Sequence, residues 1–166
     1  MIQKEQLKWD SYWWAAHDQR LPFLANPVAI FLYSHCERDG TSPDPSVWAS
    51  DRQLQIANSL FELPLTLSDK LDDVAEAFRA ETDVAVGLAD EGMGHINRAN
   101  IRQHYRIESI VIPRDCSNDE AVVFLDGECE WEPKHGLRIA VRDGQPIAYS
   151  WQSGGISANH IHENFK

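Results

Sequence analysis

The sequence predicts an α+β fold, in which an antiparallel sheet of about six strands carries two helices on one face. Aromatic and β-branched runs lie near both ends of the chain, and two segments with helical periodicity lie between them. Turn residues separate the runs, so the predicted order is two strands, two helices and four strands. The 166 residues are long enough for one core. We therefore predict a single domain over residues 1–166, ending in a flexible tail over residues 152–166.

Two strands are predicted near the start of the chain. Aromatic side chains dominate residues 9–16, and residues 28–35 are rich in Ile, Phe, Leu and Tyr. The connection between them contains Pro22, and we expect the two strands to pair antiparallel. A helix over residues 27–38 is the alternative, because this run has no clean hydrophobic period.

Two helices are predicted in the middle of the chain. The first begins at a capping Ser46 and ends at Pro64, and the second covers residues 68–82 with a serine cap. Residues 82–89 either extend the second helix or form a short strand, and residues 90–100 are typical of a polar, glycine-rich loop. The apolar stripes are Trp48, Leu54, Ile56, Leu60 and Phe61 in the first helix, and Leu71, Val74, Ala75 and Phe78 in the second.

The remaining strands are one over residues 103–113 and a three-stranded meander over residues 120–151. One face of the first meander strand is apolar, and we expect it to face the core. Its members are Val123, Leu125, Cys129 and Trp131. The opposite face carries carboxylates that we expect to meet water or a partner. They are Asp126, Glu128, Glu130 and Glu132.

Matching of apolar faces gives the predicted register of the meander. The predicted opposite pairs are Trp131 with Leu137, Cys129 with Ile139, Glu130 with Arg138, and Asp126 with Arg142. For the second turn, a two-residue loop of Asp143 and Gly144 would move Ile147 off the apolar face. We therefore predict a three-residue loop over residues 142–144 with Gly144 at positive φ. It would pair Ile139 with Ile147 and Leu137 with Tyr149.

The formal net charge of −11 argues against binding of nucleic acid, because a phosphate-binding surface needs a basic patch and the lysines and arginines are scattered. The same charge suits a basic protein partner, a cation or simple solubility. Cys36, Cys116 and Cys129 have no paired spacing, and the polar first residues do not form an export signal. No apolar run reaches the ~20 residues of a membrane helix. We therefore predict a cytoplasmic protein with no membrane contact.

The first candidate site for chemistry is His160-x-His162. On an extended chain both imidazoles point the same way, which allows a two-point grip on zinc or nickel. The third ligand could be His95, His104 or Glu163. The alternative is a pair of surface histidines in a frayed tail.

The second candidate combines Cys129 with Glu130, Glu132 and His135, because a Cys–His pair can supply a nucleophile and its base. We expect Cys129 to pack inward, where a thiol is inert, and neighbouring arginines to neutralise the carboxylates. We therefore interpret this segment as a structural hairpin. Residues 87–97 lack both the dinucleotide-binding and P-loop spacings, and the common hydrolase motifs are absent.

Residues 129–137, with the sequence CEWEPKHGL, resemble a motif of uncharacterised bacterial proteins, in which a Cys-x-Trp-Asp-x-Glu-His-Gly-Leu stretch closes a late hairpin. The early Leu21-Pro22-Phe23 and the strand after it are also similar to that family. Glu132 stands where the family has Asp, and Lys134 where it has Glu. The resemblance implies no activity. It implies a loose association with immunity or accessory proteins encoded near bacterial toxins.

From the sequence we predict a protein-binding module, of immunity or accessory type, with no cofactor and no catalytic residue. The predicted binding residues are Asp126, Glu128, Glu130, Glu132 and His135. One alternative is a metal-dependent hydrolase that uses His160 and His162 together with one more histidine. The other alternative is a small-molecule binder with a cleft between the helices and the sheet.

Overall fold

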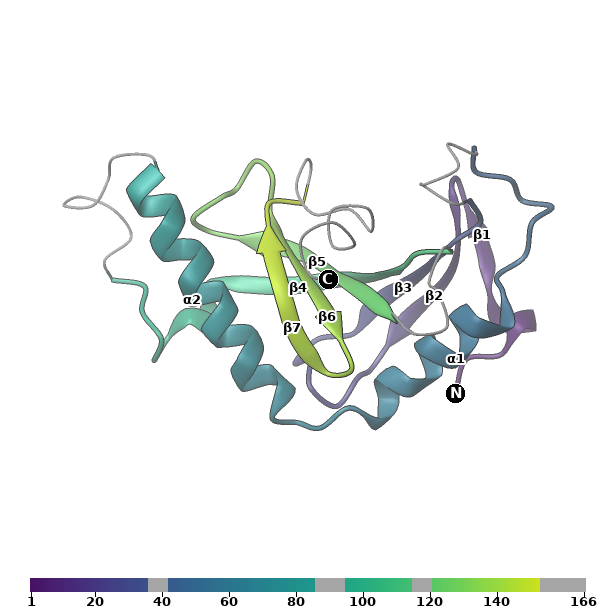
Figure 1. Ribbon diagram of the computed structural model, residues 1–166, viewed down its shortest axis with the longest axis horizontal. Helices are drawn as coiled ribbons and strands as arrows, with labels where there is room; N and C mark the ends of the chain where they lie inside the picture. Colours follow the sequence, from purple (N-terminus) through teal and green to yellow (C-terminus); the bar gives the residue numbers. More distant parts are fainter. Residues whose placement is uncertain (36–41, 86–94, 115–120, 153–166) are drawn as a thin grey trace.

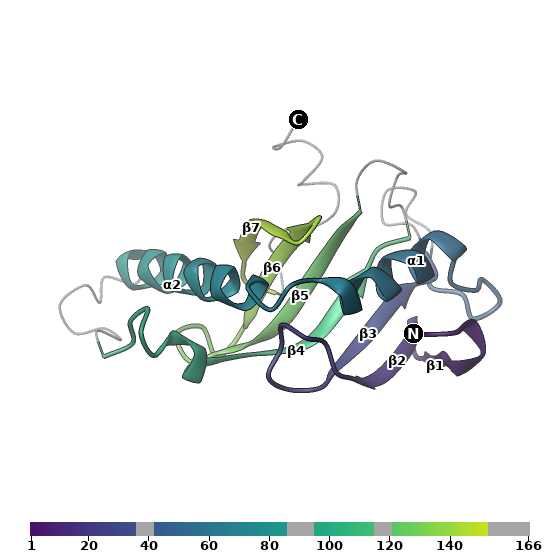
Figure 2. The ribbon, with the colours of Figure 1, turned by 90° about the horizontal axis from the view of Figure 1, so that it is seen from below.

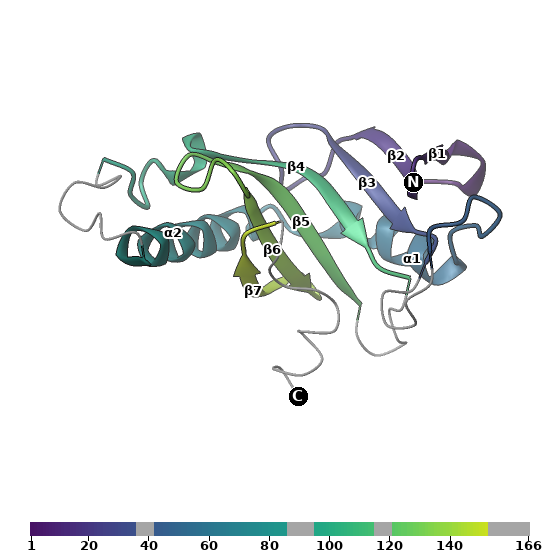
Figure 3. The ribbon, with the colours of Figure 1, turned by 90° about the horizontal axis from the view of Figure 1, so that it is seen from above.

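The computed structural model describes residues 1–35, 42–85, 95–114 and 121–152 (Figure 1). Within these ranges, seven strands form one sheet in chain order, and both α-helices lie on the same face of it (Figures 2 and 3). The strands are β1 Lys8–Asp10, β2 Trp13–Gln19, β3 Val28–Tyr33, β4 Tyr105–Ile112, β5 Val122–Cys129, β6 Leu137–Arg142 and β7 Gln145–Ser150. The helices are α1 Asp51–Ser59 and α2 Leu67–Ala85, with the 3-10 turns η1 Lys4–Gln6, η2 Leu60–Glu62 and η3 Ile101–Gln103.

The α+β class and the helices on one face are confirmed, but the sheet is mixed and has one more strand than predicted. The predicted first strand is divided by a tight turn in which Ser11 has φ 54°, so that β1 folds back on β2. Strands β3 and β4 run parallel, whereas all other neighbours are antiparallel. The chain between β3 and β4 passes through both helices, and a crossover of that length is what a parallel pair needs.

Helix α1 begins later than predicted because Ser50, rather than Ser46, caps it. The Ser50 side chain accepts a hydrogen bond from the Gln53 backbone N–H, and the Gln53 side-chain oxygen accepts one from the Ser50 backbone N–H, which completes a capping box. Gln53 is fully buried, and its amide donates to the carbonyls of Tyr33 and Ile112. One side chain therefore ties α1 to the ends of the two parallel strands.

Helix α2 confirms the predicted second helix and its apolar face but not its serine cap, because the helix begins at Leu67 and Ser68 lies in its first turn. Leu71, Ala75 and Phe78 are buried against the sheet, and Val74 is partly buried. The helix continues to Ala85, so the first residues of the ambiguous 82–89 segment extend it, while residues 86–94 lie outside the described part of the chain.

The predicted register between β5 and β6 is wrong. In the structure Leu125 lies opposite Ile139 and Asp126 opposite Arg138, because β5 ends at Cys129 and a connection of seven residues precedes β6. That connection closes at Gly136, which has φ 66° and whose N–H donates to the Glu132 carbonyl.

The predicted three-residue length of the turn between β6 and β7 is also wrong, although its positive φ at Gly144 is confirmed. Arg142 pairs with Gln145 across a two-residue turn in which Asp143 and Gly144 have φ 50° and 69°. An irregularity beside Val141 then shifts the register, so that Tyr149, rather than Ile147, lies opposite Ile139. Ile147 can face away from the main core because the outer face of the sheet has a small apolar cluster of its own.

The main core lies between the sheet and the helices and includes the predicted apolar face of β5. The predicted residues in this core are Val123, Leu125 and Cys129 of β5 and Trp131, which follows the end of the strand. In the described part of the chain, no helix has the length and apolarity needed to cross a membrane.

Candidate functional site

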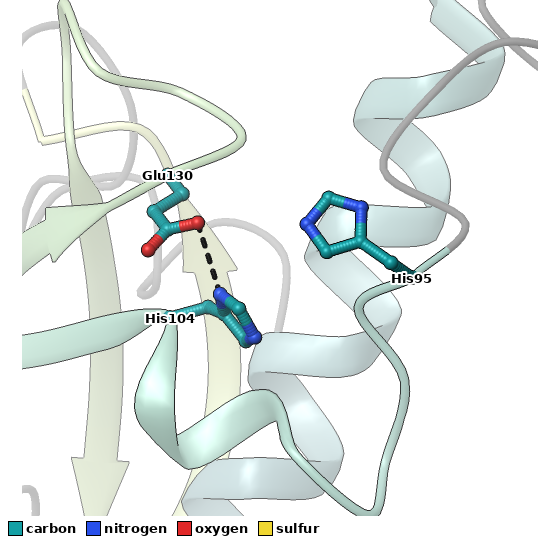
Figure 4. A group of neighbouring side chains, drawn as sticks. All are labelled: His95, His104 and Glu130. Carbon is teal, nitrogen blue, oxygen red and sulfur yellow. Dashed lines mark hydrogen bonds and ion pairs between the residues drawn. The ribbon is translucent and has the colours of Figure 1, made fainter.

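Two imidazoles and a carboxylate meet at one end of β4 and β5. His95, His104 and Glu130 each offer one ligand atom, and these three atoms lie within 4.8 Å of one another. The His104 Nδ1 atom is 2.9 Å from the Glu130 carboxylate, and the two imidazole rings are 5.7 Å apart at an interplanar angle of 81° (Figure 4). Among the described residues, these three side chains form the group that could hold a metal ion.

Strand pairing fixes the distance between His104 and Glu130. Tyr105 is opposite Cys129 in the β4–β5 ladder, so the two ligands are the residues just outside that pair. The Glu130 N–H donates to the His104 carbonyl at 3.0 Å, which extends the pairing by one more bond. Both backbones are therefore held by the sheet, and both side chains project from its end.

The loop that carries His95 is fastened by its own hydrogen bonds and by apolar anchors. The His95 carbonyl accepts a bond of 2.9 Å from the Asn100 side chain. The next residue, Ile96, is buried, as is Ile101 in η3. These contacts bring the imidazole of His95 beside that of His104, although the two residues are nine positions apart in the chain.

A buried carboxylate on α2 also holds the loop that carries His95. Asp72 is almost fully buried and accepts hydrogen bonds from Arg98, Arg102 and the Tyr105 hydroxyl, the last at 2.8 Å. Burial together with the bond to Asp72 raises the pKa of the Tyr105 phenol well above its usual range, so this group stays protonated. All three donors lie between or next to the two histidines, so the Asp72 cluster positions the segment from His95 to His104.

The site is accessible to solvent. The Glu130 side chain is 54% exposed and that of His104 is 16% exposed. A cavity of about 410 Å³ adjoins both residues. Imidazole nitrogens and a carboxylate oxygen are donors that zinc accepts, and three such ligands are the number that open zinc sites use.

The predicted acidic binding face is interrupted by ion pairs. Asp126 is buried and forms two bonds with Arg138, at 2.7 and 2.6 Å. Glu128 is 75% exposed and lies 3.9 Å from Arg106. Glu132 contacts His135 at 2.9 Å, while Glu130 points to His104. The structure therefore brings one of the five predicted residues, Glu130, into the metal-ligating group.

Cys129 has the properties predicted for a structural residue. It is buried in the main core together with Trp131. Burial raises the pKa of its thiol to about 12, so that little thiolate exists near neutral pH. A nucleophilic role for this cysteine therefore lacks physical support.

The other predicted ligands, His160, His162 and Glu163, lie outside the described residues. His95 and His104 were expected only as possible third ligands to that pair, and the structure instead places them with each other and with Glu130. No local motif could signal this group, because its members are separated by nine and by 26 residues. The one available signal was that His104 and Glu130 lie at the ends of strands that can pair.

Comparison with known proteins gives a family but no activity. A family model described as "Domain of unknown function (DUF6985)" matches residues 3–156. The chain belongs to the DUF6985 family. This agrees with the expectation of a family without an assigned function. No match was found among curated proteins or among solved structures.

Proposed function

We propose that this DUF6985 protein binds one divalent transition-metal ion, with zinc as the leading candidate, through His95, His104 and Glu130. The observation that carries the proposal is the convergence of three donor atoms within 4.8 Å from three separate segments. The backbone bond between Glu130 and His104 and the Asp72 cluster hold these segments before any ion arrives. A site whose ligands are already positioned loses less conformational entropy when it binds.

The donor set indicates which ions the site would take. Two imidazoles favour zinc, nickel, cobalt and copper over magnesium and calcium, which require mostly oxygen ligands. The contact of 2.9 Å between His104 Nδ1 and Glu130 already places these two donor atoms at a separation that two ligands of one ion can have. When both atoms bind the ion, it replaces the hydrogen bond between them. Glu130 therefore favours binding as a ligand that is already positioned beside His104.

We expect calorimetric titration of the full, untagged chain with Zn²⁺ to show one ion per chain. Replacement of His104 with alanine removes one of the three ligands and is expected to weaken binding by about 100-fold or more, because loss of a group that only supports a ligand already costs about 10–100-fold. His135→Ala is the matched control, because His135 also contacts a carboxylate, at 2.9 Å, but belongs to no metal-ligating group found in the described residues. Its affinity for Zn²⁺ should equal that of the unchanged protein. Absence of binding, or equal loss in both variants, would refute the proposal.

We also propose, as a second function, that the chain acts by binding another protein, as an immunity or accessory factor in a bacterial cytoplasm. The supporting observations are the formal charge of −11 and the exposed Glu128. A basic partner is the complementary class. Affinity capture at physiological salt should retain a basic protein and release it as the salt concentration rises. Recovery of no partner, or of one that high salt does not release, would count against this function.

A small-molecule site between helix and sheet, the remaining alternative, has limited support. A cavity of about 280 Å³ is lined by residues 22–26, by Ser68 at the start of α2 and by Ile107 of β4. This is at or below the size at which small-molecule sites usually begin.

A further inference from the structure

We propose that the metal ion bound at His95, His104 and Glu130 keeps one coordination position for a small oxyanion, such as a carboxylate, which occupies the adjoining pocket. This inference rests on the proposed metal function and names the class of ligand that the same site would take. The described residues offer three donors, whereas zinc and cobalt take at least four.

The pocket is placed to receive such a ligand. His104 and Glu130 form part of the wall of this cavity of about 410 Å³, and Gln103 and Arg106 supply further polar groups. Tyr105, Cys129 and Pro133 complete the lining, and of these Pro133 is exposed and adds apolar surface. A cavity of this volume holds a small organic molecule, and polar groups beside an apolar wall suit one with a charged end and a carbon end.

The charge of the pocket depends on the ion. Without metal, the charge of Arg106 is opposed by Glu128 and Glu130 in the pocket and by its ion-pair partner Glu108, which leaves two net negative charges when the histidine is neutral. A divalent ion neutralises these charges and is itself the cation at the open position. An oxyanion is therefore repelled from the empty pocket and attracted to the loaded one.

Arg106 can contact the anion directly. In the described part of the chain its ion pairs with Glu108 and Glu128 both use the same guanidinium nitrogen, Nη2. A guanidinium has five N–H donors in a planar fork, and the remaining ones can bind an oxyanion whose other oxygen is on the metal. Arg106 is therefore the residue that would distinguish an oxyanion from a neutral ligand.

The test uses the full chain loaded with Co²⁺, whose visible d–d absorption reports on its coordination. Acetate and, separately, inorganic phosphate are titrated into the loaded protein. We expect a saturable spectral change with at least one of them, and the stronger response identifies the class of oxyanion. Arg106→Gln should retain Co²⁺ affinity and weaken anion binding by about tenfold, the loss expected for one charge-assisted contact. Arg114→Gln is the matched control, since Arg114 follows the far end of β4 and donates to the Trp48 carbonyl.

The outcomes separate the two proposals. If Co²⁺ does not bind, the proposed function and this inference both fail. If Co²⁺ binds and neither anion changes its spectrum, the metal function stands and the open position is refuted. A response that appears only in the His160→Ala, His162→Ala double variant would also refute it, because the chain itself would then fill the position. Equal anion affinity in the Arg106 and Arg114 variants would overturn the role of Arg106.

Discussion

Replacement of Asp72 with alanine is expected to lower the free energy of unfolding by about 3 kcal/mol, the lower end of the cost of breaking a buried ion pair. Asp72 is 2% exposed and accepts bonds from two arginines and the Tyr105 hydroxyl. Without the carboxylate, the Tyr105 phenol loses its acceptor in a partly buried place, which alone costs about 1–3 kcal/mol. The arginines limit the total, because their side chains are 45% and 51% exposed and can regain water.

Asp73→Ala is the matched control for this variant. Asp73 is the next residue of α2 and also pairs with Arg98, but its side chain is 67% exposed. An exposed ion pair contributes between zero and about 1 kcal/mol, so this variant should unfold close to the unchanged protein. Urea unfolding followed by circular dichroism measures both. Equal small losses would show that the Asp72 cluster is not a buried anchor.

The same two variants also test whether Asp72 positions the ligands of the proposed metal site, apart from its effect on stability. Arg98, Arg102 and Tyr105 lie within or beside the segment from His95 to His104, so loss of Asp72 should also weaken Zn²⁺ binding under conditions in which the variant is folded. Asp73→Ala should bind Zn²⁺ as the unchanged protein does. A variant that is less stable but binds Zn²⁺ normally would show that the loop is held without Asp72, by its own hydrogen bonds and its apolar anchors.

The elements that the sequence predicted well are those whose signals are local. The stripe of Leu71, Ala75 and Phe78 recurs at helical spacing, and helix α2 buries that stripe. The alternation of Val123, Leu125 and Cys129 likewise predicted a strand face, and the β5 side chains follow it. Local periodicity determines which face is buried, and this was sufficient for the class of the fold and the inner face of the meander.

The register of the strands depended on side chains distant in sequence, and there the predictions failed. Matching apolar residues across β5 and β6 favoured Cys129 opposite Ile139. In the structure Asp126 lies opposite Arg138 instead, and the ion pair between them gives each of these two charged side chains a partner. The same limit applies to the candidate metal site. Its geometry comes from the β4–β5 pairing and from Asp72 on a helix, neither of which a reading of His95 or His104 alone could reveal.

Replacement of Gly127 with alanine is expected to have the other large effect, a loss of about 3 kcal/mol or more in the free energy of unfolding, at the upper end of the cost of overpacking. A Cβ atom on Gly127 would lie 2.0 Å from the carbonyl oxygen of Arg106 and 2.9 Å from the Cα of Ile107. These are backbone atoms of the neighbouring strand β4, so no side chain can rotate away. Strands β4 and β5 would have to separate where Ile107 pairs with Gly127.

Gly144→Ala is the matched comparison, because it introduces backbone strain without a collision between the new Cβ atom and a neighbouring backbone. Gly144 has φ 69°, but an added Cβ would meet only the tip of the Leu63 side chain, at 3.1 Å. The expected cost is about 1–2 kcal/mol, that of a left-handed conformation in a residue with a Cβ. Chemical denaturation of both variants compares their free energies of unfolding.

Because Glu130 follows Gly127 by three residues, separation of β4 from β5 should also carry this carboxylate away from His104 and reduce Zn²⁺ binding, whereas Gly144→Ala should leave binding intact. A Gly127 variant as stable as the Gly144 variant would mean that the two central strands are not as closely packed as the structure requires.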